Sequence, residues 1–300
     1  MKRLLILFLA FLLALPAAAW AETVITSFYP IRLFALNLVD GIDGVEVVSL
    51  AEPGTGCLHD YQLQTSDMKL LAKADVFLIN GAGMESYLSG VFEAFPALPV
   101  VDASAGVALL EDCSGHDHDH GENDHDHTYN AHIWLDARNA ILMVNNLAEG
   151  LIAAMPEHAE AIVANRSAYV LRLTALDEEL RAALADVPHK DVITFHEAFP
   201  YFANAYGLNV VAVVNREPDD ALSPRALAEL CKTVAGLGAP PLFVEPQYED
   251  MAAQTISRET GAPLYMLDPI VTGPETAIPL TLYEDVMRQN LAVLLEALGE

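Results

Sequence analysis

Four side chains that could bind a metal ion occur at comparable intervals along the chain. They are His59, His132, His196 and Asp268. Each one follows an apolar run or stands at a turn beyond one, which is where α/β proteins place their ligands. Three imidazoles and one carboxylate fit a tetrahedral or near-tetrahedral zinc site. Because manganese tolerates more oxygen donors than zinc does, this set of side chains favours zinc.

A structural role competes with the ligand role at these positions. His132 is flanked by apolar residues in the segment 130–136 (NAHIWLD), and such a histidine is by itself more typical of a protein core than of a metal site. Asp268 precedes a proline and could be a turn residue. The ligand role is favoured over the structural role because the other metal-type residues stand at comparable intervals along the chain. His158 and His189 stand at polar helix ends, so we do not expect them to be ligands.

A second group of metal-type side chains lies in the segment 115–127, which contains no apolar residue. Such a segment cannot bury a core face, so we expect a solvated loop. Its histidines are His116, His118, His120, His125 and His127. They alternate with carboxylates, but ordering a flexible segment costs roughly 1–2 kcal/mol of backbone entropy per residue. We therefore expect an auxiliary zinc site weaker than the interior one. The alternative is an acidic linker that binds nothing.

Apolar, β-branched runs alternate with helical segments along the whole chain. The runs lie at 22–28, 45–50, 76–80 and 99–102 in the first half, and at 192–195, 208–214, 242–245 and 263–267 in the second. This alternation predicts an α/β fold with mainly parallel sheets. Between the halves, apolar residues recur at helical spacing from Pro156 to about Asp186, which predicts one long helix.

These elements predict two α/β lobes joined by one long rigid helix, with the metal site at the lobe interface. We expect a signal peptide at 1–21, an N-terminal α/β lobe at 22–155, a connecting helix at 156–186 and a C-terminal α/β lobe at 187–300. Two of the four metal-type residues come from each half. The site is therefore expected between the lobes, where small ligands commonly bind.

The composition is typical of an exported, acidic protein. The chain begins with two basic residues, continues with an apolar run over 4–15 and reaches small residues before Ala21, which predicts a secretory signal cleaved after Ala21. The run is shorter than the ~20 residues of a spanning helix, which disfavours a membrane anchor. A formal net charge of −27 disfavours nucleic acid and anionic membranes as partners.

The cysteines give no sign of a thiolate metal site. The chain contains Cys57, Cys113 and Cys231, and none of them has the CxxC spacing of zinc-binding cysteines. An exported protein permits a disulfide, and three cysteines allow one internal pair at most. Cys57 and Cys113, which both lie near metal-type residues, are the favoured pair.

Five segments resemble, in their order, the zinc-binding members of the metal-specific solute-binding proteins of ABC importers. They are 57–61 (CLHDY), 130–136 (NAHIWLD), 195–202 (FHEAFPYF), 244–247 (VEPQ) and 267–269 (LDP). The resemblance covers the whole mature chain, and its second and third segments are the most specific. It implies two α/β lobes joined by a rigid helix, with Zn²⁺ held between them. It also implies delivery of zinc to an ABC permease in the inner membrane. We therefore expect a periplasmic, monomeric receptor that is not an enzyme.

Two details of this resemblance bear on the metal. In the manganese and iron branch the third ligand position is usually glutamate, whereas His196 stands here and favours zinc. Some zinc members use an acidic residue just before the first histidine, and Leu58 cannot fill that role. The fourth ligand is then Asp268 or water. Gln62 and Leu63 also depart from the Glu-Pro pair that the family often has after the tyrosine.

Three other functions stay open. The nearest is a solute-binding protein for manganese or another divalent metal. A zinc hydrolase would need an open coordination position and a general base. Glu197 directly after His196 suggests such a base, but Pro200 stands where an HExxH motif has its second histidine. A periplasmic metal buffer without a transporter would suit the histidine-rich loop alone.

Overall fold

Two four-stranded parallel sheets form the two lobes in the computed structural model, which describes residues 21–53, 58, 61–111, 129–214, 223–248 and 251–299. The first sheet, in the order β2-β1-β3-β4, contains β1 (Glu22–Thr26), β2 (Val45–Ser49), β3 (Val76–Ile79) and β4 (Val100–Asp102). The second, in the order β6-β5-β7-β8, contains β5 (Asp191–Thr194), β6 (Asn209–Val213), β7 (Leu242–Val244) and β8 (Leu264–Met266). Every pairing between these strands is parallel. The expected fold class, two α/β lobes with mainly parallel sheets, is confirmed.

Several positions that the sequence singles out lie outside the described residues. They are most of the predicted signal peptide, Cys57, His59, Cys113 and the histidine-rich loop 115–127. The first ligand, the auxiliary loop and the disulfide between Cys57 and Cys113 therefore stay predictions. Among the described residues, Cys231 is a free cysteine.

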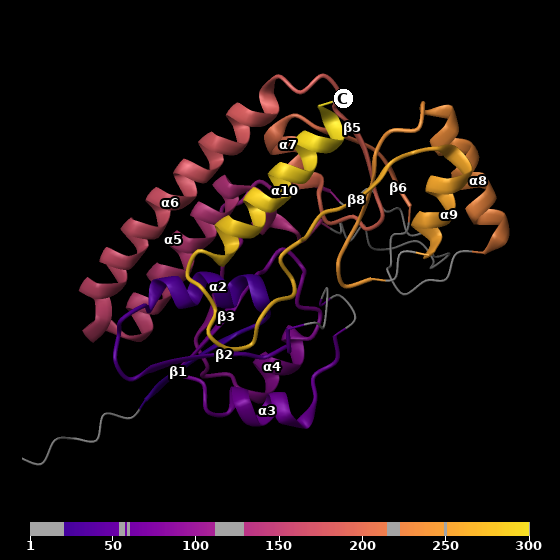
Figure 1. Ribbon diagram of the computed structural model, residues 1–300. Helices are drawn as coiled ribbons and strands as arrows, with labels where there is room; N and C mark the ends of the chain where they lie inside the picture. Colours follow the sequence, from indigo (N-terminus) through magenta and orange to yellow (C-terminus); the bar gives the residue numbers. More distant parts are fainter. Residues whose placement is uncertain are drawn as a thin grey trace, which may run out of the picture.

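Helices alternate with the strands, and two of the inner strands, β3 and β7, are apolar throughout. All four residues of β3 are buried, as expected for a parallel strand covered on both faces. The helices that follow strands of the first sheet are α2 (Tyr29–Leu38), α3 (Thr65–Leu71) and α4 (Leu88–Ala94). Those that follow strands of the second sheet are α7 (Pro200–Tyr206), α8 (Pro224–Gly236) and α9 (Met251–Thr260). Figure 1 shows α8 and α9 together at the outer edge of the second lobe.

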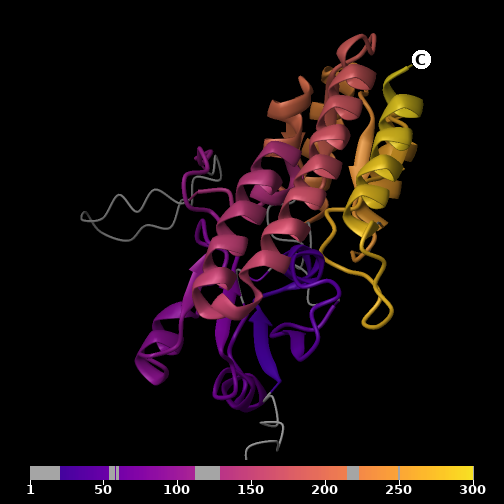
Figure 2. The same ribbon diagram turned by 90° about the vertical axis from the view of Figure 1, so that its left-hand side faces the viewer.

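One long helix runs along both lobes. It is α6 (Ala159–Ala185), whose 27 residues span about 40 Å at ~1.5 Å per residue. The short turn η2 (Pro156–His158) precedes it, so the predicted helix 156–186 is present. Its fully buried face consists of Ile162, Tyr169, Leu173, Leu176, Leu180 and Leu184. Figure 2 shows α6 beside α5 (Ala137–Ala154) and α10 (Leu282–Leu298), which pack against it.

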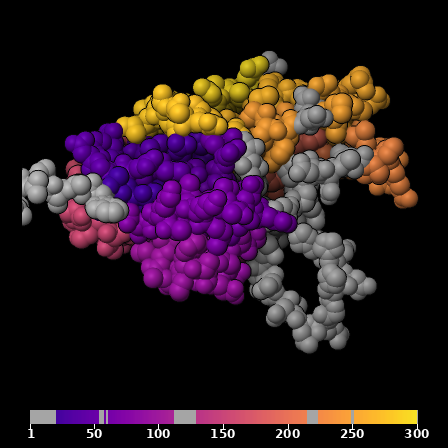
Figure 3. All heavy atoms as spheres, turned by 90° about the horizontal axis from the view of Figure 1, so that it is seen from below, coloured from indigo at the N-terminus to yellow at the C-terminus, as the bar shows by residue number. Residues whose placement is uncertain are grey.

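The C-terminal part of the chain returns from the second lobe to the first. After β8, the segment 269–281 passes along α2. Tyr29 Oη donates a hydrogen bond to the carbonyl of Pro274 at 3.1 Å, and Arg32 donates to the carbonyl of Glu275 at 3.1 Å. In Figure 3 the yellow C-terminal atoms lie directly against the indigo N-terminal ones. The two lobes are therefore connected by this segment as well as by α6.

The protein has two apolar cores, and the larger one includes residues of both lobes, such as Val192 and Phe243 of the second sheet. A small core lies between the second sheet and helices α8 and α9, and it contains Ile193, Val214, Val234, Leu242, Ile256 and Ala262. The larger core includes the first sheet together with α5, α6 and α10. The last helix of the sequence, α10, contributes residues such as Tyr283 and Met287 to this larger core.

A buried carboxylate of α10 is paired with α6. Arg172 Nε donates to Glu284 Oε1 at 2.7 Å, and Glu284 is only 2% exposed. Arg172 also donates to the side chain of Asn37 in α2. Three helices from distant parts of the sequence therefore meet at one guanidinium group.

Replacing Arg172 should destabilise the protein. Arg172→Ala leaves a buried carboxylate without its charged partner, so we expect the free energy of unfolding to fall by about 2 kcal/mol. The control is Arg225→Ala, which removes an exposed ion pair with Glu229 in α8 and should cost less than about 0.5 kcal/mol. Urea denaturation measures both. Equal effects would show that Arg172 contributes no more than a surface charge does.

Candidate metal centre

His132 is held in place by residues of the first lobe. It precedes the short helix η1 (Ile133–Leu135) and is 2% exposed. Asn130 Oδ1 accepts the backbone N–H of His132 at 3.0 Å and lies 3.2 Å from His132 Nδ1. The carbonyl of Ala131 accepts a hydrogen bond from Asn80 Nδ2 at 3.0 Å. The backbone and the ring of His132 are therefore both positioned from their own side of the interface.

The buried Glu85 fixes the backbone at Asn80, the residue that bonds to Ala131. Glu85 accepts the N–H groups of Asn80 at 2.7 Å and of Gly81 at 3.0 Å, directly after β3. Burial raises the pKa of the Glu85 carboxyl to about 7, against the opposing effect of its hydrogen bonds. Because Asn80 in turn holds Ala131, the end of β3 fixes the segment that carries His132.

His196 is positioned by the second lobe. It lies just beyond β5 and is 5% exposed. Its Nδ1 lies 3.2 and 3.4 Å from the two carboxylate oxygens of Glu245, which directly follows β7. Gln247 Nε2 donates to Glu245 Oε2 at 2.6 Å. Strands β5 and β7 are neighbours, so both side chains stand at the carboxyl edge of one parallel sheet, the usual place for a ligand.

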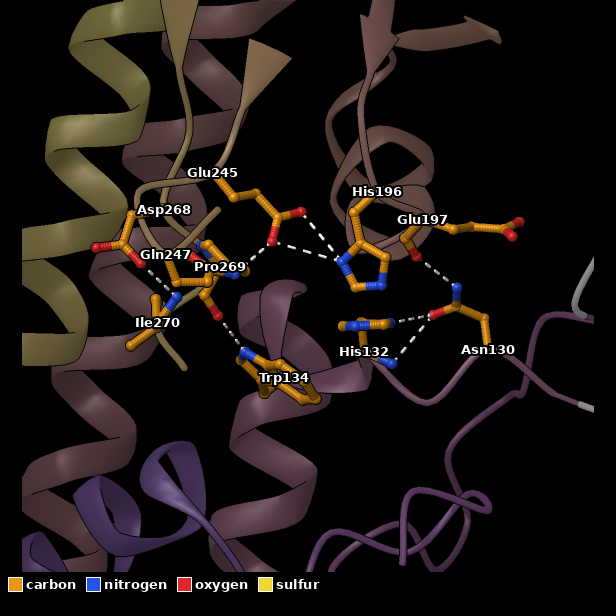
Figure 4. Close-up of polar contacts among 10 residues, drawn as sticks. All are labelled: Asn130, His132, Trp134, His196, Glu197, Glu245, Gln247, Asp268, Pro269 and Ile270. Carbon is orange, nitrogen blue, oxygen red and sulfur yellow. Dashed lines mark hydrogen bonds and ion pairs between the residues drawn. The ribbon is translucent and has the colours of Figure 1, made fainter. Parts of the chain in front are cut away.

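The two histidines meet between the lobes, as Figure 4 shows. Their ring centroids are 4.9 Å apart, and the ring planes form an angle of 79°. Asn130 Nδ2 donates to the carbonyl of Glu197 at 2.7 Å, and Trp134 Nε1 donates to the carbonyl of Pro269 at 2.8 Å. Since Nδ1 of each ring faces an oxygen atom, Nε2 is the nitrogen through which each would bind a metal.

Asp268 stands at the second-lobe side of the same interface. Its N–H donates to Asn290 Oδ1 at 2.9 Å, and its Oδ1 accepts the N–H of Ile270 at 2.7 Å. Ile270 has a φ of 64°, an unfavourable left-handed conformation for a β-branched residue, which this hydrogen bond stabilises. Burial raises the pKa of the Asp268 carboxyl, the bond from Ile270 lowers it, and the charge of Glu245 raises it further.

The predicted ligands are only partly brought together. His132 and His196 are adjacent, whereas Glu245 lies between His196 and Asp268 in Figure 4. Within the described residues, His132, His196 and Asp268 do not form a group whose ligand atoms all lie within 4.8 Å of one another. His59 lies outside the described residues. Their role as a set of four metal ligands therefore stays a prediction.

A different group of metal-type side chains lies far from this interface. Glu22, Glu157 and His158 have ligand atoms within 4.8 Å of one another. His158 Nε2 forms an ion pair with Glu22 Oε2 at 3.1 Å. Burial, followed by the charge of Glu157, raises the pKa of the Glu22 carboxyl. Because Glu22 begins β1, this group lies at the amino edge of the first sheet, away from the two histidines.

Sequence reasoning misses two residues that position the histidines, Asn130 and Glu245. Glu245 carries a signal that could have identified it, since it is a carboxylate at the end of a short apolar strand of a parallel sheet. The bond of Asn130 to the carbonyl of Glu197 carries none, because the two residues are 67 positions apart. Only the packing of the lobes brings these two segments together.

The fold and the site together define a two-lobed binding protein with a metal-type site. The fold has two parallel α/β lobes and a long helix that runs along both, and the site is a buried pair of histidines between the lobes. The family of the zinc-uptake complex component A, periplasmic, matches residues 24–297, and the chain belongs to this family. The members of this family are metal-binding components of uptake, so the chain is classed with transport components and not with enzymes. The hydrolase alternative is thereby excluded.

Three relatives illustrate the similarity. Zinc-binding protein AdcA from Streptococcus pyogenes serotype M3 is 33% identical over 285 residues, which cover 90% of this chain and 55% of AdcA. High-affinity zinc uptake system protein ZnuA from Brucella abortus is 29% identical over 311 residues, covering 90% of each chain. The solute-binding protein FpvC from Pseudomonas aeruginosa, solved with Mn²⁺, is 29% identical with a TM-score of 0.80, covering 93% of this chain and 98% of FpvC. A second FpvC structure, with Ni²⁺, is 28% identical with a TM-score of 0.77, covering 92% of this chain and 96% of that one.

The chain spans 55% of the length of the AdcA relative that it matches. What the relatives bind therefore bears on this chain only as support for a proposal.

Across the described residues, no helix combines the length and the apolar character that crossing a bilayer requires.

Loss of Asn130 should weaken metal binding. Asn130→Ala removes the oxygen that faces His132 Nδ1 and the bond to the carbonyl of Glu197, so both histidines lose a constraint. We expect an affinity for Zn²⁺ about tenfold lower, as for other residues that orient metal ligands. The control is Asn145→Ala, which removes a bond to Ile141 within α5. Competition with a chromogenic chelator measures both, and equal affinities would contradict the positioning role.

Proposed function

We propose that this protein is an extracytoplasmic zinc receptor that captures Zn²⁺ between its lobes and delivers it to an ABC permease in the inner membrane. The observation that carries the proposal is the buried pair of His132 and His196, with ring centroids 4.9 Å apart between the lobes. Membership of the zinc-uptake family and the names of the AdcA and ZnuA relatives support zinc as the metal.

The proposed ligands are His59, His132, His196 and Asp268. Imidazole nitrogen suits zinc, and one carboxylate completes a four-coordinate set. Asp268 Oδ1 accepts the N–H of Ile270, so we assign the zinc contact to Oδ2 or to a water molecule in its place. Each imidazole must be neutral to bind, so proton competition weakens the site in acid and favours capture near neutral pH.

We propose a signal peptide cleaved after Ala21, a periplasmic location and a monomeric receptor. The lobes would comprise residues 22–155 and 187–300, with 156–186 as the connecting helix. The five histidines of the loop 115–127 would collect zinc near the interface and bind it more weakly than the interior site does.

A second candidate is a receptor for manganese or another divalent metal. The observation in its favour is that FpvC, which is similar in fold and sequence, was solved with Mn²⁺ and with Ni²⁺. Against manganese stands the donor set, because this chain places a second imidazole, not a harder oxygen, beside His132.

His196 should be indispensable for tight binding. Changing a residue that merely orients a ligand commonly costs 10–100-fold in affinity, so His196→Ala, which removes the ligand itself, should cost more than about 100-fold. His189→Ala is the control, because His189 is exposed and stands on the loop before β5. Chelator competition with Zn²⁺ measures both variants. Unchanged affinity in His196→Ala would refute the proposed site.

His196 should also set the choice of metal. His196→Glu replaces a nitrogen donor with a harder oxygen donor, so the ratio of zinc affinity to manganese affinity should fall by about tenfold or more. Titration with each ion, in the variant and in the unsubstituted protein, gives the two ratios. A ratio that stays the same would mean that the donor at this position does not select the metal.

A further inference from the structure

Glu245 is a buried carboxylate whose role the proposed ligand set leaves unexplained. It is 3% exposed and directly follows β7. In Figure 4 its carboxylate lies between His196 and Asp268, and its dashed contacts run to His196 and Gln247. Both of its oxygens face His196 Nδ1, at 3.2 and 3.4 Å. Among the ion pairs of the described residues, the partner of Glu245 is His196 and not a lysine or arginine.

A carboxylate in this position dictates which ring nitrogen carries the proton. Carboxylate oxygens accept hydrogen bonds, so the two contacts of Glu245 favour an N–H at Nδ1 of His196. A neutral imidazole then has its lone pair at Nε2, which is the form that binds a metal. Gln247 donates to Glu245 Oε2 at 2.6 Å and so keeps the carboxylate turned toward the ring.

The other histidine of the pair has a different partner. His132 Nδ1 faces the amide oxygen of Asn130 at 3.2 Å, which fixes the same tautomer without a negative charge. A charged acceptor increases the basicity of an imidazole ligand more than a neutral one does. The two histidines should therefore differ as ligands, although their rings are equally buried.

We propose that Glu245 is a positioning residue for the metal site: it holds His196 in the Nδ1–H tautomer and makes Nε2 of His196 the stronger imidazole donor of the pair. The inference rests on the proposed function, because it assigns a role toward the bound metal. The negative charge of Glu245 acts on the ion through His196, without direct contact between the carboxylate and the metal.

The test begins with the unsubstituted, zinc-loaded full-length protein. Long-range ¹H–¹⁵N NMR of the histidine rings reports which nitrogen carries hydrogen and which binds the ion. We expect Nδ1–H and zinc-bound Nε2 for His196. Zinc on Nδ1 of His196 would overturn the inference while leaving the proposed receptor function intact. Failure of the unsubstituted protein to bind zinc tightly would refute the proposed function itself.

The second arm compares two buried glutamates. Glu245→Gln removes the charge and keeps the shape, and it should bind one zinc ion 10–100-fold more weakly, with His196 still a ligand. Glu284→Gln is the matched control, because Glu284 is 2% exposed but pairs with Arg172 away from the histidines. Its zinc affinity should stay within about twofold of the unsubstituted value. Equal zinc affinities in the two variants would overturn the inference, and the NMR measurement decides the matter if Glu245→Gln does not fold.

Discussion

Hydrogen bonds across the lobe interface keep the two histidines close together. Asn130 donates to the carbonyl of Glu197, and Tyr201 Oη donates back to the carbonyl of Asn130 at 2.9 Å. Trp134 reaches the carbonyl of Pro269 on the other side of the pair. Sliding one lobe past the other would leave these buried groups without partners, at about 1–3 kcal/mol each. The closeness of the two rings therefore depends on hydrogen bonds between protein groups.

The rest of the architecture keeps this interface in register. Helix α6 runs beside both lobes, α10 contributes to the large core that spans them, and the segment 269–281 is bonded along α2. Arg172 joins three of these helices through Glu284 and Asn37. Connections at several separate points restrict the rotation of one lobe against the other.

The electrostatics of the interface suit a cation. The buried Glu245 and the partly exposed Asp268 bring two carboxylates to the interface, and the charge of Glu245 contributes to the raised pKa of the Asp268 carboxyl. A divalent cation bound at the histidines would offset both charges at once. The formal net charge of −27 acts in the same direction at long range, since it attracts cations and repels anionic partners.

The local features of the fold follow from the sequence alone. The apolar run 76–80 became a buried strand, the stripe from Ile162 to Leu184 became the buried face of α6, and His196 stands just beyond its strand. Each of these depends on neighbours in the sequence, through strand propensity or helical periodicity. The regular alternation of strand and helix also predicts the two lobes, because it is compatible with few parallel arrangements.

The way in which the site is held depends on contacts between residues far apart in the sequence. The contact of Glu245 with His196 joins residues 49 positions apart, and that of Tyr29 with Pro274 joins residues 245 apart. No periodicity marks such pairs, since they arise from the packing of one lobe on the other. The same holds for the place of Asp268, because its backbone is fixed by Asn290 of α10 and by the left-handed turn at Ile270. Residue types and spacing indicate which side chains can bind a metal, and long-range packing decides how close together they stand.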